Sequence, residues 1–254
     1  MCKDLVSVIM PTYNSSRYVA ESIRSIEAQT YTNWELLITD DCSVDDTVRI
    51  VSEFADRDKR IELTVLAQNS GAGVARNESI KRAEGRYLAF CDSDDRWEPE
   101  KLSIQLRFMK ANGYELTYTS YSVCRDDGER IGAVRCKSRL SYFTLLCDNG
   151  IGCLTAMYDT SRIGKIYMPT IRKRQDWGLW LAVIKRTKYA YGLPNDYLSI
   201  YRQGNGISSN KVKLIKSNYA VYHELEGYSA IVSMLLLTFC FVPSYIFKKI
   251  KNRV

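Results

Sequence analysis

Short apolar runs alternate with amphipathic stretches through the first part of the chain. Three helices are expected between these runs, over residues 17–28, 45–55 and 71–85, because apolar residues recur there three to four positions apart. Regular alternation of strand and helix predicts an α/β fold around a mostly parallel sheet. Four runs have the length and residue types of buried strands: LVSVIM (5–10), WELLIT (34–39), IELTVLA (61–67) and RYLAFC (86–91).

Local signals refine the expected helices. Val19, Ile23 and Ile26 fall on one face of the first helix and predict its buried side. Ser43 and Asp46 have the spacing of a capping box before the second helix. Gly85 is expected to close the third helix.

The alternation becomes less regular after Trp97. A helix is expected over 98–113, followed by a strand over 114–123. Further along, the segment RKRQDWGLWLAVIKRTK (172–188) combines a basic loop with an apolar helix. Another helix is expected from about Lys211.

The stretch 228–247 contains twenty residues without a charge, and KKIKNR follows it. A single helix of this length would be about 30 Å long, enough to span a bilayer. Pro243, the Ser and Thr residues and the basic end favour a helix lying in the membrane interface. A spanning helix and a packed or dimerising helix are the alternatives.

Composition and charge narrow the class of protein. Hydrophobic residues make up 46% and charged residues 26% of the chain, as in folded globular proteins. The eight cysteines contain no CxxC pair and no signal peptide precedes the first run, which favours reduced thiols in the cytosol. A single histidine argues against a His-rich zinc site and against a Ser-His-Asp triad.

The net charge of +7 conceals an asymmetry between the two parts of the chain. Residues 1–120 carry 15 basic and 20 acidic residues, whereas 161–216 carry 12 basic residues and only Asp176 and Asp196 as acids. The two parts are therefore expected to contact different chemical groups.

Acidic loops follow two of the predicted strands. The carboxyl ends of parallel strands converge, and the loops there read PTYN, DDCSVDD and DSDD. In DSDD, the carboxylates of Asp92, Asp94 and Asp95 would repel one another by about 1 kcal/mol per pair even near water. A bound Mg²⁺ or Mn²⁺ would remove this repulsion, because the carboxylates would become its ligands. An acidic turn that caps the next helix remains the alternative. An EF-hand is excluded because Trp97 and Ser103 stand where Gly and Glu are needed.

Other loop residues suggest a nucleotide ligand. Asp40 and Asp41 could accept hydrogen bonds from a ribose or a base edge. Thr12 and Asn14 of the PTYN loop could do the same, although this loop also fits a simple turn. The GAGVARN stretch is no dinucleotide fingerprint, because Arg76 replaces its third glycine. Arg76 is expected to pair with a phosphate or carboxylate, or to be a surface arginine.

Asp176 is notable because it lies in the basic span. Neighbouring cations should keep its carboxylate ionised. Its place at the start of an apolar helix also fits an N-cap. Trp177 beside it could offer a flat face to a sugar ring or pack in the core.

The segments PTYN, DDCSVDD, NSGAGVARN, DSDD and QDW, in this order, resemble family 2 glycosyltransferases with the GT-A fold over about residues 1–210. The short chain and its apolar, then basic, tail are similar to bacterial enzymes that build O-antigen or capsule. The resemblance implies a UDP-sugar donor. Its uracil and ribose would be held by four residues, with Arg76 beside them: Pro11, Thr12, Tyr13 and Asp41.

The resemblance also implies roles for the acidic residues. Asp92 and Asp94 match the DxD motif, with Asp94 the direct ligand of Mn²⁺ or Mg²⁺ and Asp92 toward the ribose, and Asp95 would contact the donor sugar or support the metal. Asp176 matches the general base, and Arg202 with the metal would stabilise the leaving diphosphate. One base opposite one leaving group implies inversion at the anomeric carbon. The histidine that often completes the metal site is absent after Arg202, so a third ligand stays open.

The resemblance predicts transfer of a hexose, glucose or galactose, from a UDP-sugar to a lipid-linked saccharide such as GlcNAc-diphospho-undecaprenol. A β-linkage in O-antigen (lipopolysaccharide) synthesis is expected, at the cytoplasmic face of the bacterial inner membrane. The expected organisation is a nucleotide-sugar-binding half (1–120), an acceptor-binding half (121–210) and C-terminal membrane-associating helices (211–254).

Two other classes of function remain alternatives. A sugar nucleotidyltransferase would also bind metal and phosphate with carboxylates at strand ends, but has little use for a membrane tail. A nucleic-acid-binding module is suggested by the pI of 8.9. No recognition motif accompanies the basic residues and the first half is acidic, so no nucleic-acid partner is expected.

Overall fold

The first apolar run forms the strand around which the sheet is built. In the computed structural model, which describes residues 2–171, 173–203, 211–244 and 246, β1 (Cys2–Thr12) pairs in parallel with β2 (Trp34–Asp40) and β4 (Gly85–Phe90). β3 (Ile61–Val65) extends the sheet in parallel beyond β2. The four strands predicted from the sequence are therefore confirmed.

The second part of the chain continues the same sheet with mixed directions. Its strand order is β3-β2-β1-β4-β9-β6-β10-β5, with β7 paired to β6 and β8 to β10. β6 and β10 are parallel, whereas β9 is antiparallel to both of its neighbours. The bounds are β5 (Arg96–Trp97), β6 (Leu116–Cys124), β7 (Arg130–Val134), β8 (Arg139–Ser141), β9 (Met157–Asp159) and β10 (Tyr189–Arg202).

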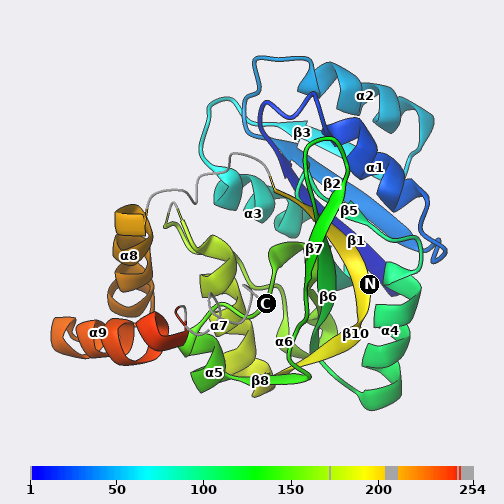
Figure 1. Ribbon diagram of the computed structural model, residues 1–254. Coiled ribbons are helices and arrows are strands. Elements are labelled where there is room, and N and C mark those ends of the chain that lie inside the picture. The colour runs from blue at the N-terminus through cyan, green and yellow to red at the C-terminus, as the bar shows by residue number, and fades with distance from the viewer. Residues whose placement is uncertain (1, 172, 204–210, 245, 247–254) are drawn as a thin grey trace.

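Helices cover both faces of the sheet (Figure 1). The helices are α1 (Val19–Glu27), α2 (Thr47–Arg57), α3 (Ala72–Arg82), α4 (Lys101–Asn112), α5 (Tyr142–Cys147), α6 (Thr160–Ile163), α7 (Gln175–Thr187), α8 (Lys211–Ala220) and α9 (Ala230–Leu236). A 3₁₀ turn, η1 (Cys153–Thr155), and two π-helical turns, η3 (Val221–Leu225) and η4 (Leu237–Phe241), complete the described elements.

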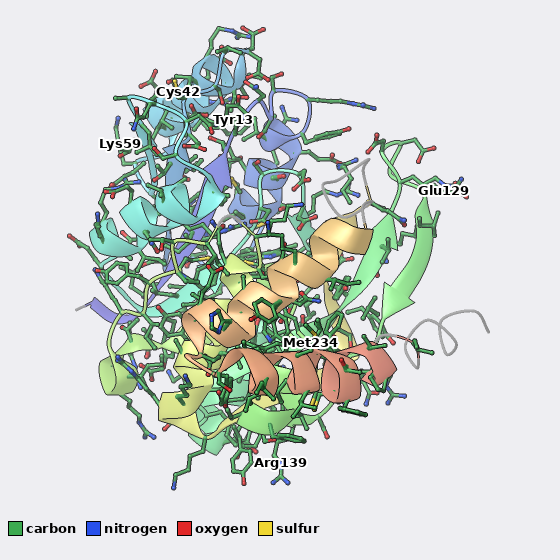
Figure 2. All side chains as sticks on the ribbon, turned by 90° about the vertical axis from the view of Figure 1, so that its left-hand side faces the viewer. Tyr13, Cys42, Lys59, Glu129, Arg139 and Met234 are labelled. Atoms are coloured by element: carbon green, nitrogen blue, oxygen red, sulfur yellow. The ribbon has the colours of Figure 1, made fainter. Side chains whose placement is uncertain are left out.

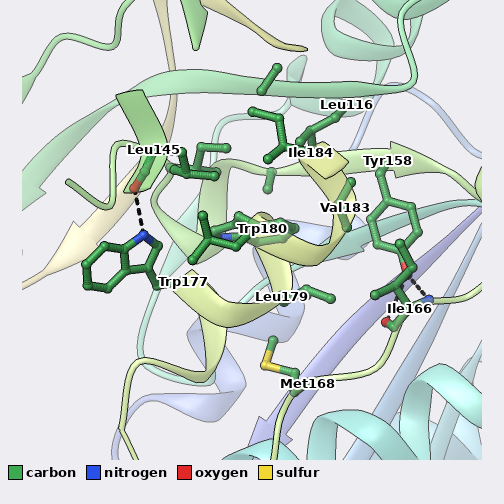
Figure 3. Close-up of a cluster of buried hydrophobic side chains, with 14 of the residues drawn as sticks. Leu116, Leu145, Tyr158, Ile166, Met168, Trp177, Leu179, Trp180, Val183 and Ile184 are labelled. Carbon is green, nitrogen blue, oxygen red and sulfur yellow. Dashed lines mark hydrogen bonds between the residues drawn. The ribbon is translucent and has the colours of Figure 1, made fainter. Parts of the chain in front are cut away.

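Alternate side chains of the central strands divide the interior into two cores. One core joins α1, α2 and α4 to one face of the sheet, and Val19, Ile23 and Ile26 lie in it as predicted. The other joins α3, α5, α7 and the C-terminal turns to the opposite face. Figure 3 shows part of this second core, where Trp177 and Trp180 are fully buried. Each strand thus contributes to both layers, as expected for a sheet with helices on both sides.

Two predicted helix ends are wrong. α2 has Asp46 as its N-cap without a side-chain bond, and the Ser43 hydroxyl donates instead to Asp40 Oδ2, so no capping box forms. Gly85 does not close α3, which ends at Arg82, but begins β4. A Cβ at Gly85 would lie 2.7 Å from the Ser7 backbone nitrogen, so the glycine permits close approach of β4 to β1.

In the apolar C-terminal stretch, α9 is followed directly by η4, which packs against α5. Ser233, Leu237 and Phe241 are buried, and the Phe241 ring lies 6.1 Å from the ring of Trp177. Within the described ranges, no helix has both the length and the apolar character needed to cross a bilayer. The opposite face remains exposed, as at Met234 on α9 in Figure 2, and the basic end lies outside the described residues.

Candidate active site

Asp40 joins the ends of β1 and β2. The parallel register places Thr12 opposite Asp40, and the Thr12 hydroxyl donates to Asp40 Oδ2 at 2.8 Å. The backbone N–H and the hydroxyl of Ser43 also donate to this carboxylate, which is fully buried. A buried carboxylate needs such partners to offset its lost hydration. Asp40 therefore holds two loops together and has no exposed surface for a ligand.

Asp41 connects the end of β2 to the start of α3. Its two oxygens accept hydrogen bonds from the backbone N–H groups of Ser70 and Gly71, at 2.6 and 2.7 Å. The side chain of Asn69 donates to the Asp41 carbonyl, and Asp41 is only 3% exposed. Asp41 thus shapes the loop before α3, and its contact with a ribose or uracil stays a prediction.

The PTYN loop exposes one of its three predicted ligand-binding side chains. Pro11 and Thr12 are buried, whereas Tyr13 is half exposed. The Ser15 and Ser93 hydroxyl oxygens lie 2.8 Å apart, which joins this loop to the DSDD turn. The loops predicted to meet at the strand ends are therefore in contact, and their roles toward a nucleotide stay predictions.

Arg76 forms an ion pair with Asp92. Arg76 Nη2 lies 2.5 Å from Asp92 Oδ1, and the arginine side chain is only 10% exposed, so Arg76 is no surface arginine. Burial favours loss of the proton, but the charges of Asp92 and, more weakly, Asp176 outweigh it and raise the pKa of Arg76. The guanidinium therefore stays charged, paired directly with Asp92 and stabilised at longer range by Asp176.

Arg202 holds the DSDD turn from the last strand of the sheet. Its backbone N–H donates to Asp95 Oδ1 at 2.9 Å, and its Nε donates to the Asp94 carbonyl at 3.0 Å. Nη1 donates to the Asp126 carbonyl and Nη2 pairs with Glu21. Since all its side-chain nitrogens have protein partners, Arg202 positions the turn. The direct contact with a leaving diphosphate, predicted from the sequence, is untested.

Asp94 and Asp95 have different surroundings within the turn. Asp95 is 2% exposed, and burial together with the charges of Asp94 and Asp92 raises its pKa. Asp94 reaches solvent, and no described residue hydrogen-bonds to its carboxylate through a side chain. Protein packed around the carboxyl, with the charge of Asp92, nevertheless raises the pKa of Asp94 to about 6. A cation bound to the Asp94 carboxylate would therefore offset its repulsion from the charge of Asp92.

Asp176 lies in the first turn of α7. The Asn149 side-chain amide donates to Asp176 Oδ2 at 2.8 Å, which fixes the orientation of the carboxylate. The N-cap of α7 is Arg174, so the alternative of Asp176 as an N-cap is wrong. Trp177 is fully buried and its Nε1–H donates to the Leu145 carbonyl at 2.7 Å (Figure 3), which places it in the core and not on a sugar-binding face.

One cleft of about 410 Å³ is lined both by the DSDD turn (92–95), called the acidic turn below, and by Asp176. Asp92 and Asp95 line it from the end of β4, and Asp176 lines it from α7. Further lining comes from β6, from residues 134–137, from residues 148–154, and from single residues of β8, α5 and β10 and the residue before α7. Carboxylates from two distant segments therefore face one space of the size in which ligands bind.

Several residues of the site have no clear signal in the sequence. Tyr121 and Tyr201 line the cleft with ring centroids 6.2 Å apart, where they could face a sugar. Asn149 orients Asp176, and Glu21 pairs with Arg96 and Arg202. Aromatic residues at strand ends could have suggested the tyrosines. The polar partners depend on contacts between distant segments, which periodicity does not report.

The acidic turn fits a metal that arrives with a phosphate ligand. Across the described ranges, no three or more His, Cys, Asp or Glu side chains are arranged to hold a metal ion. Asp92 is paired with Arg76 and Asp95 with the Arg202 backbone, which leaves the Asp94 carboxylate available. Mg²⁺ needs only one or two protein carboxylates when phosphate oxygens complete its shell. The arrangement suits such a shared site better than a closed protein cage.

The fold and the cleft define an α/β transferase of the GT-A-like type. Residues 7–161 match the profile described as Glycosyl transferase family 2. This match covers more than half of the chain, so the protein belongs to glycosyltransferase family 2 and is a glycosyltransferase. Of the classes of function left open by the sequence, family membership therefore selects glycosyl transfer. The alternatives were a sugar nucleotidyltransferase and a nucleic-acid-binding module.

Curated relatives match the chain over most of its length. TuaG of Bacillus subtilis (strain 168), named as a teichuronic acid biosynthesis glycosyltransferase, is 41% identical over 99% of this chain and 98% of its own. WfgD of Escherichia coli, named as a UDP-Glc:alpha-D-GlcNAc-diphosphoundecaprenol beta-1,3-glucosyltransferase, is 38% identical over 85% of each chain.

Solved structures share the fold. S. aureus TarS 1–349 in complex with UDP-GlcNAc has a TM-score of 0.68 at 23% identity, covering 91% of this chain and 70% of that one. The chain spans 42% of the longer TarS chain. At this identity the likeness supports the GT-A-like arrangement of the sheet and helices, and the chemistry must come from the site itself.

Proposed function

We propose that this glycosyltransferase is an inverting, metal-dependent hexosyltransferase. It moves glucose or galactose from a UDP-sugar to a lipid-linked saccharide such as GlcNAc-diphospho-undecaprenol and forms a β-linkage. The observation that carries the proposal is that Asp92, Asp95 and Asp176 line one and the same cleft. It offers carboxylates for a metal-bound donor on one side and a base on the other.

In this proposal Asp94 is the direct ligand of Mn²⁺ or Mg²⁺, with Asp92 beside it. The metal would supply positive charge where the leaving diphosphate becomes negative. The exposed Asp94 carboxylate, with its raised pKa, supports this assignment. The structural neighbour PcManGT from Pyrobaculum calidifontis was solved with GDP-Man and Mn²⁺, at a TM-score of 0.61. Arg202 acts through the turn that it holds.

Asp176 takes the proton from the attacking acceptor hydroxyl. Its hydrogen bond from Asn149 fixes one oxygen and leaves the other to accept that proton. A base on the wall opposite the donor carboxylates gives a single displacement, in which the new bond forms on the face opposite the departing UDP. This geometry supports inversion.

The donor nucleotide lies near the ends of β1 and β2. Pro11, Thr12, Tyr13 and Asp41 form the surroundings of the uracil and ribose, with the half-exposed Tyr13 ring as the exposed contact. Arg76 balances the charge of Asp92 beside them. Structures of TarS with UDP and with UDP-GlcNAc share this fold, which supports a uridine nucleotide.

The acceptor is membrane-borne in this proposal. WfgD and WfaP of Escherichia coli are named for transfer of glucose to GlcNAc-diphosphoundecaprenol, and TuaG for teichuronic acid synthesis, which supports a role in surface polysaccharide assembly. The C-terminal residues 211–254 would lie on the cytoplasmic face of the inner membrane, with 1–120 binding the donor and 121–210 the acceptor. The exposed side chains Ile231, Met234 and Phe239 support an interfacial helix.

A donor and acceptor screen tests the proposal. Purified protein is incubated with Mn²⁺, a panel of nucleotide-sugars and a synthetic GlcNAc-diphospho-lipid, and the linkage in the product is read by NMR. Transfer from UDP-glucose or UDP-galactose with a β-linked product is expected. An α-linked product or transfer that persists fully in EDTA would contradict the inverting or the metal-dependent part.

A further inference from the structure

Three cations line the cleft together with the carboxylates of Asp92, Asp95 and Asp176. Arg135, Lys137 and Arg174 all contribute to the lining, and none belongs to a salt bridge between described residues. Asp176 and Asp148 also line the cleft, and the charges of both act on Arg174, that of Asp176 more strongly. The segment of Arg135 and Lys137 contacts β10 at Gly192 and Asn195, whereas Asp95 contacts the same strand at Arg202, so these two cations and the DSDD turn lie toward different ends of β10.

Arg174 is held by contacts that leave part of its guanidinium available. It adopts a φ of 64°, a conformation that costs a non-glycine residue about 1 kcal/mol or more. Its Nε donates to Asn218 Oδ1 at 2.9 Å, and its guanidinium carbon lies 5.9 Å from the Trp177 ring centroid. Burial lowers the pKa of Arg174, and Asp176 and Asp148 partly offset this. Among the described residues, no acceptor is hydrogen-bonded to its two terminal nitrogens.

The segment that carries Arg135 and Lys137 is fixed to the sheet. The Lys137 carbonyl accepts from the Tyr118 hydroxyl at 2.7 Å, and Arg135 Nη2 donates to Asn195 Oδ1 at 2.9 Å. A Cβ at Gly192 would lie 2.2 Å from the Lys137 carbonyl, so this segment packs tightly on β10. Both side chains are exposed, and they are thus presented to the cleft from a rigid backbone.

Exposed apolar side chains lie on α5, which borders the cleft through Thr144, and on η4. α5 packs against η4, and Cys147 at the end of α5 contacts Cys240. Lys137 is near enough to act on Cys147, whose pKa rises to about 12 through burial and Cys240 while Lys137 opposes the rise. Phe143 on α5 is 60% exposed, and Phe239 on η4 is 71% exposed.

We propose that Arg135, Lys137 and Arg174 bind the diphosphate of the lipid-linked acceptor. This inference rests on the proposed function and adds the site for the acceptor's charged group. With the diphosphate on these cations, the sugar extends toward Asp176 and the lipid chain leads out over the apolar surface of α5 and η4. Guanidinium and ammonium groups without carboxylate partners are suited to phosphate oxygens. In the proposed function, the donor diphosphate binds instead to the metal at the acidic turn.

The test compares two acceptors that differ in the diphosphate. Arg135→Gln, Lys137→Gln and Arg174→Gln are assayed with a GlcNAc-diphospho-alkyl acceptor and with a neutral alkyl GlcNAc glycoside. Loss of one charged hydrogen bond should raise the KM for the diphosphate acceptor about ten- to a hundredfold. The KM for the neutral acceptor and for the UDP-sugar should change less than threefold. Arg139→Gln, an exposed arginine stacked on Tyr189 outside the cleft, is the matched control and should behave as wild type.

Other outcomes would overturn the inference. Equal losses with both acceptors would make the cations structural, and a raised KM for the UDP-sugar would assign them to the donor. Reduced sedimentation with anionic phospholipid vesicles at an unchanged acceptor KM would assign them to lipid headgroups. Melting temperatures within a few degrees of wild type exclude unfolding, which matters most for Arg174→Gln. If the wild-type protein transferred sugar from no UDP-sugar, the proposed function would fail before this comparison began.

Discussion

The backbone N–H of Arg202 donates a hydrogen bond to Asp95 Oδ1 at 2.9 Å, so the last strand of the sheet fixes the last carboxylate of the acidic turn. The Arg202 side chain strengthens this link through the Asp94 carbonyl and Glu21. The geometry of the proposed metal site therefore depends on a strand that contributes no metal ligand.

Replacing Arg202 should damage both stability and metal-dependent binding. Arg202→Ala removes a side chain that is only 4% exposed and leaves its buried partners unsatisfied. We expect a loss of about 3 kcal/mol in unfolding free energy, measured by urea denaturation. Mn²⁺-dependent UDP binding, measured by calorimetry, should weaken at least tenfold. Arg17→Ala, which breaks the exposed Arg17–Asp126 pair, is the control and should cost less than 1 kcal/mol.

Removing the carboxylate of Asp176 should abolish chemistry without abolishing donor binding. Asp176→Asn keeps the size of the side chain but cannot accept a proton from the acceptor hydroxyl. We expect transfer to fall at least a thousandfold while the affinity for UDP and Mn²⁺ changes less than threefold. Asn149→Ala, which removes the hydrogen bond to Asp176, should lower kcat about tenfold. Near wild-type transfer by Asp176→Asn would show that another group is the base.

Asp94→Asn should abolish metal-dependent UDP binding as well as transfer. The carboxylate is the exposed one in the turn, and its pKa of about 6 means that a proton competes with the metal below this pH. Mn²⁺ affinity of the wild-type protein should therefore fall as the pH is lowered from 7 to 5. Asp46→Asn, a change at the exposed N-cap of α2, should leave the affinity unaltered. Tight Mn²⁺ binding by Asp94→Asn would move the metal to another carboxylate.

Lys101 should make stability depend on pH. It is fully buried, donates to Gln105 Oε1 at 2.9 Å and lies 4.0 Å from the Trp97 ring centroid. Burial lowers its pKa from 10.5 to about 7. The unfolded chain holds the proton up to about pH 10 and the folded protein releases it near pH 7. The free energy of unfolding therefore rises with increasing pH, by up to about 1.4 kcal/mol per pH unit between about pH 7 and 10.

Urea unfolding at pH 7, 8 and 9 isolates this contribution. Lys101→Met retains most of the buried stem and has no proton to lose, so its stability should rise less steeply with pH than that of the wild type. Parallel curves for the two proteins would show that the Lys101 ammonium is not destabilised by its surroundings.

The exposed and buried faces of the C-terminal helix should separate membrane binding from stability. Met234→Ser and Phe239→Ser change exposed side chains and should reduce sedimentation with anionic vesicles while the melting temperature changes little. Leu237→Ala removes a side chain from the core and should cost about 2 to 4 kcal/mol with membrane binding of the folded protein retained. Deletion of 228–254 is a poorer test, since it would also remove Phe241 from the core. Unchanged sedimentation of the exposed variants would rule out this face as the membrane contact.

Much of the structure of residues 1–120 could be predicted from local patterns. Strand length, helix periodicity and acidic residues directly after apolar runs placed Asp41 and Asp92 correctly at the edge of the sheet. The partners of those residues could not be predicted. Asp41 is bonded to backbone N–H groups, and Asp92 to a buried arginine, through contacts between segments far apart in the chain.

The second half was harder for a related physical reason. β9 has three residues, too few for a periodic signal, yet its antiparallel insertion between β4 and β6 joins the two parts of the sheet. Trp177 illustrates the same limit. The sequence around a candidate base does not distinguish an aromatic residue that faces a ligand from one that is buried in the core. Its hydrogen bond to Leu145 decides for the core.

The link between Arg202 and Asp95 spans 107 positions, which affects how the protein is made. A ribosome adding about 5 to 20 residues per second finishes the acidic turn about 5 to 20 s before the arginine that restrains it. During that interval Asp92 already has its partner Arg76 in the chain, whereas Asp95 lacks the backbone N–H of Arg202 to which it is bonded in the folded protein. The proposed metal site can therefore reach its final geometry only late in biogenesis, after β1 to β4 have already been synthesised.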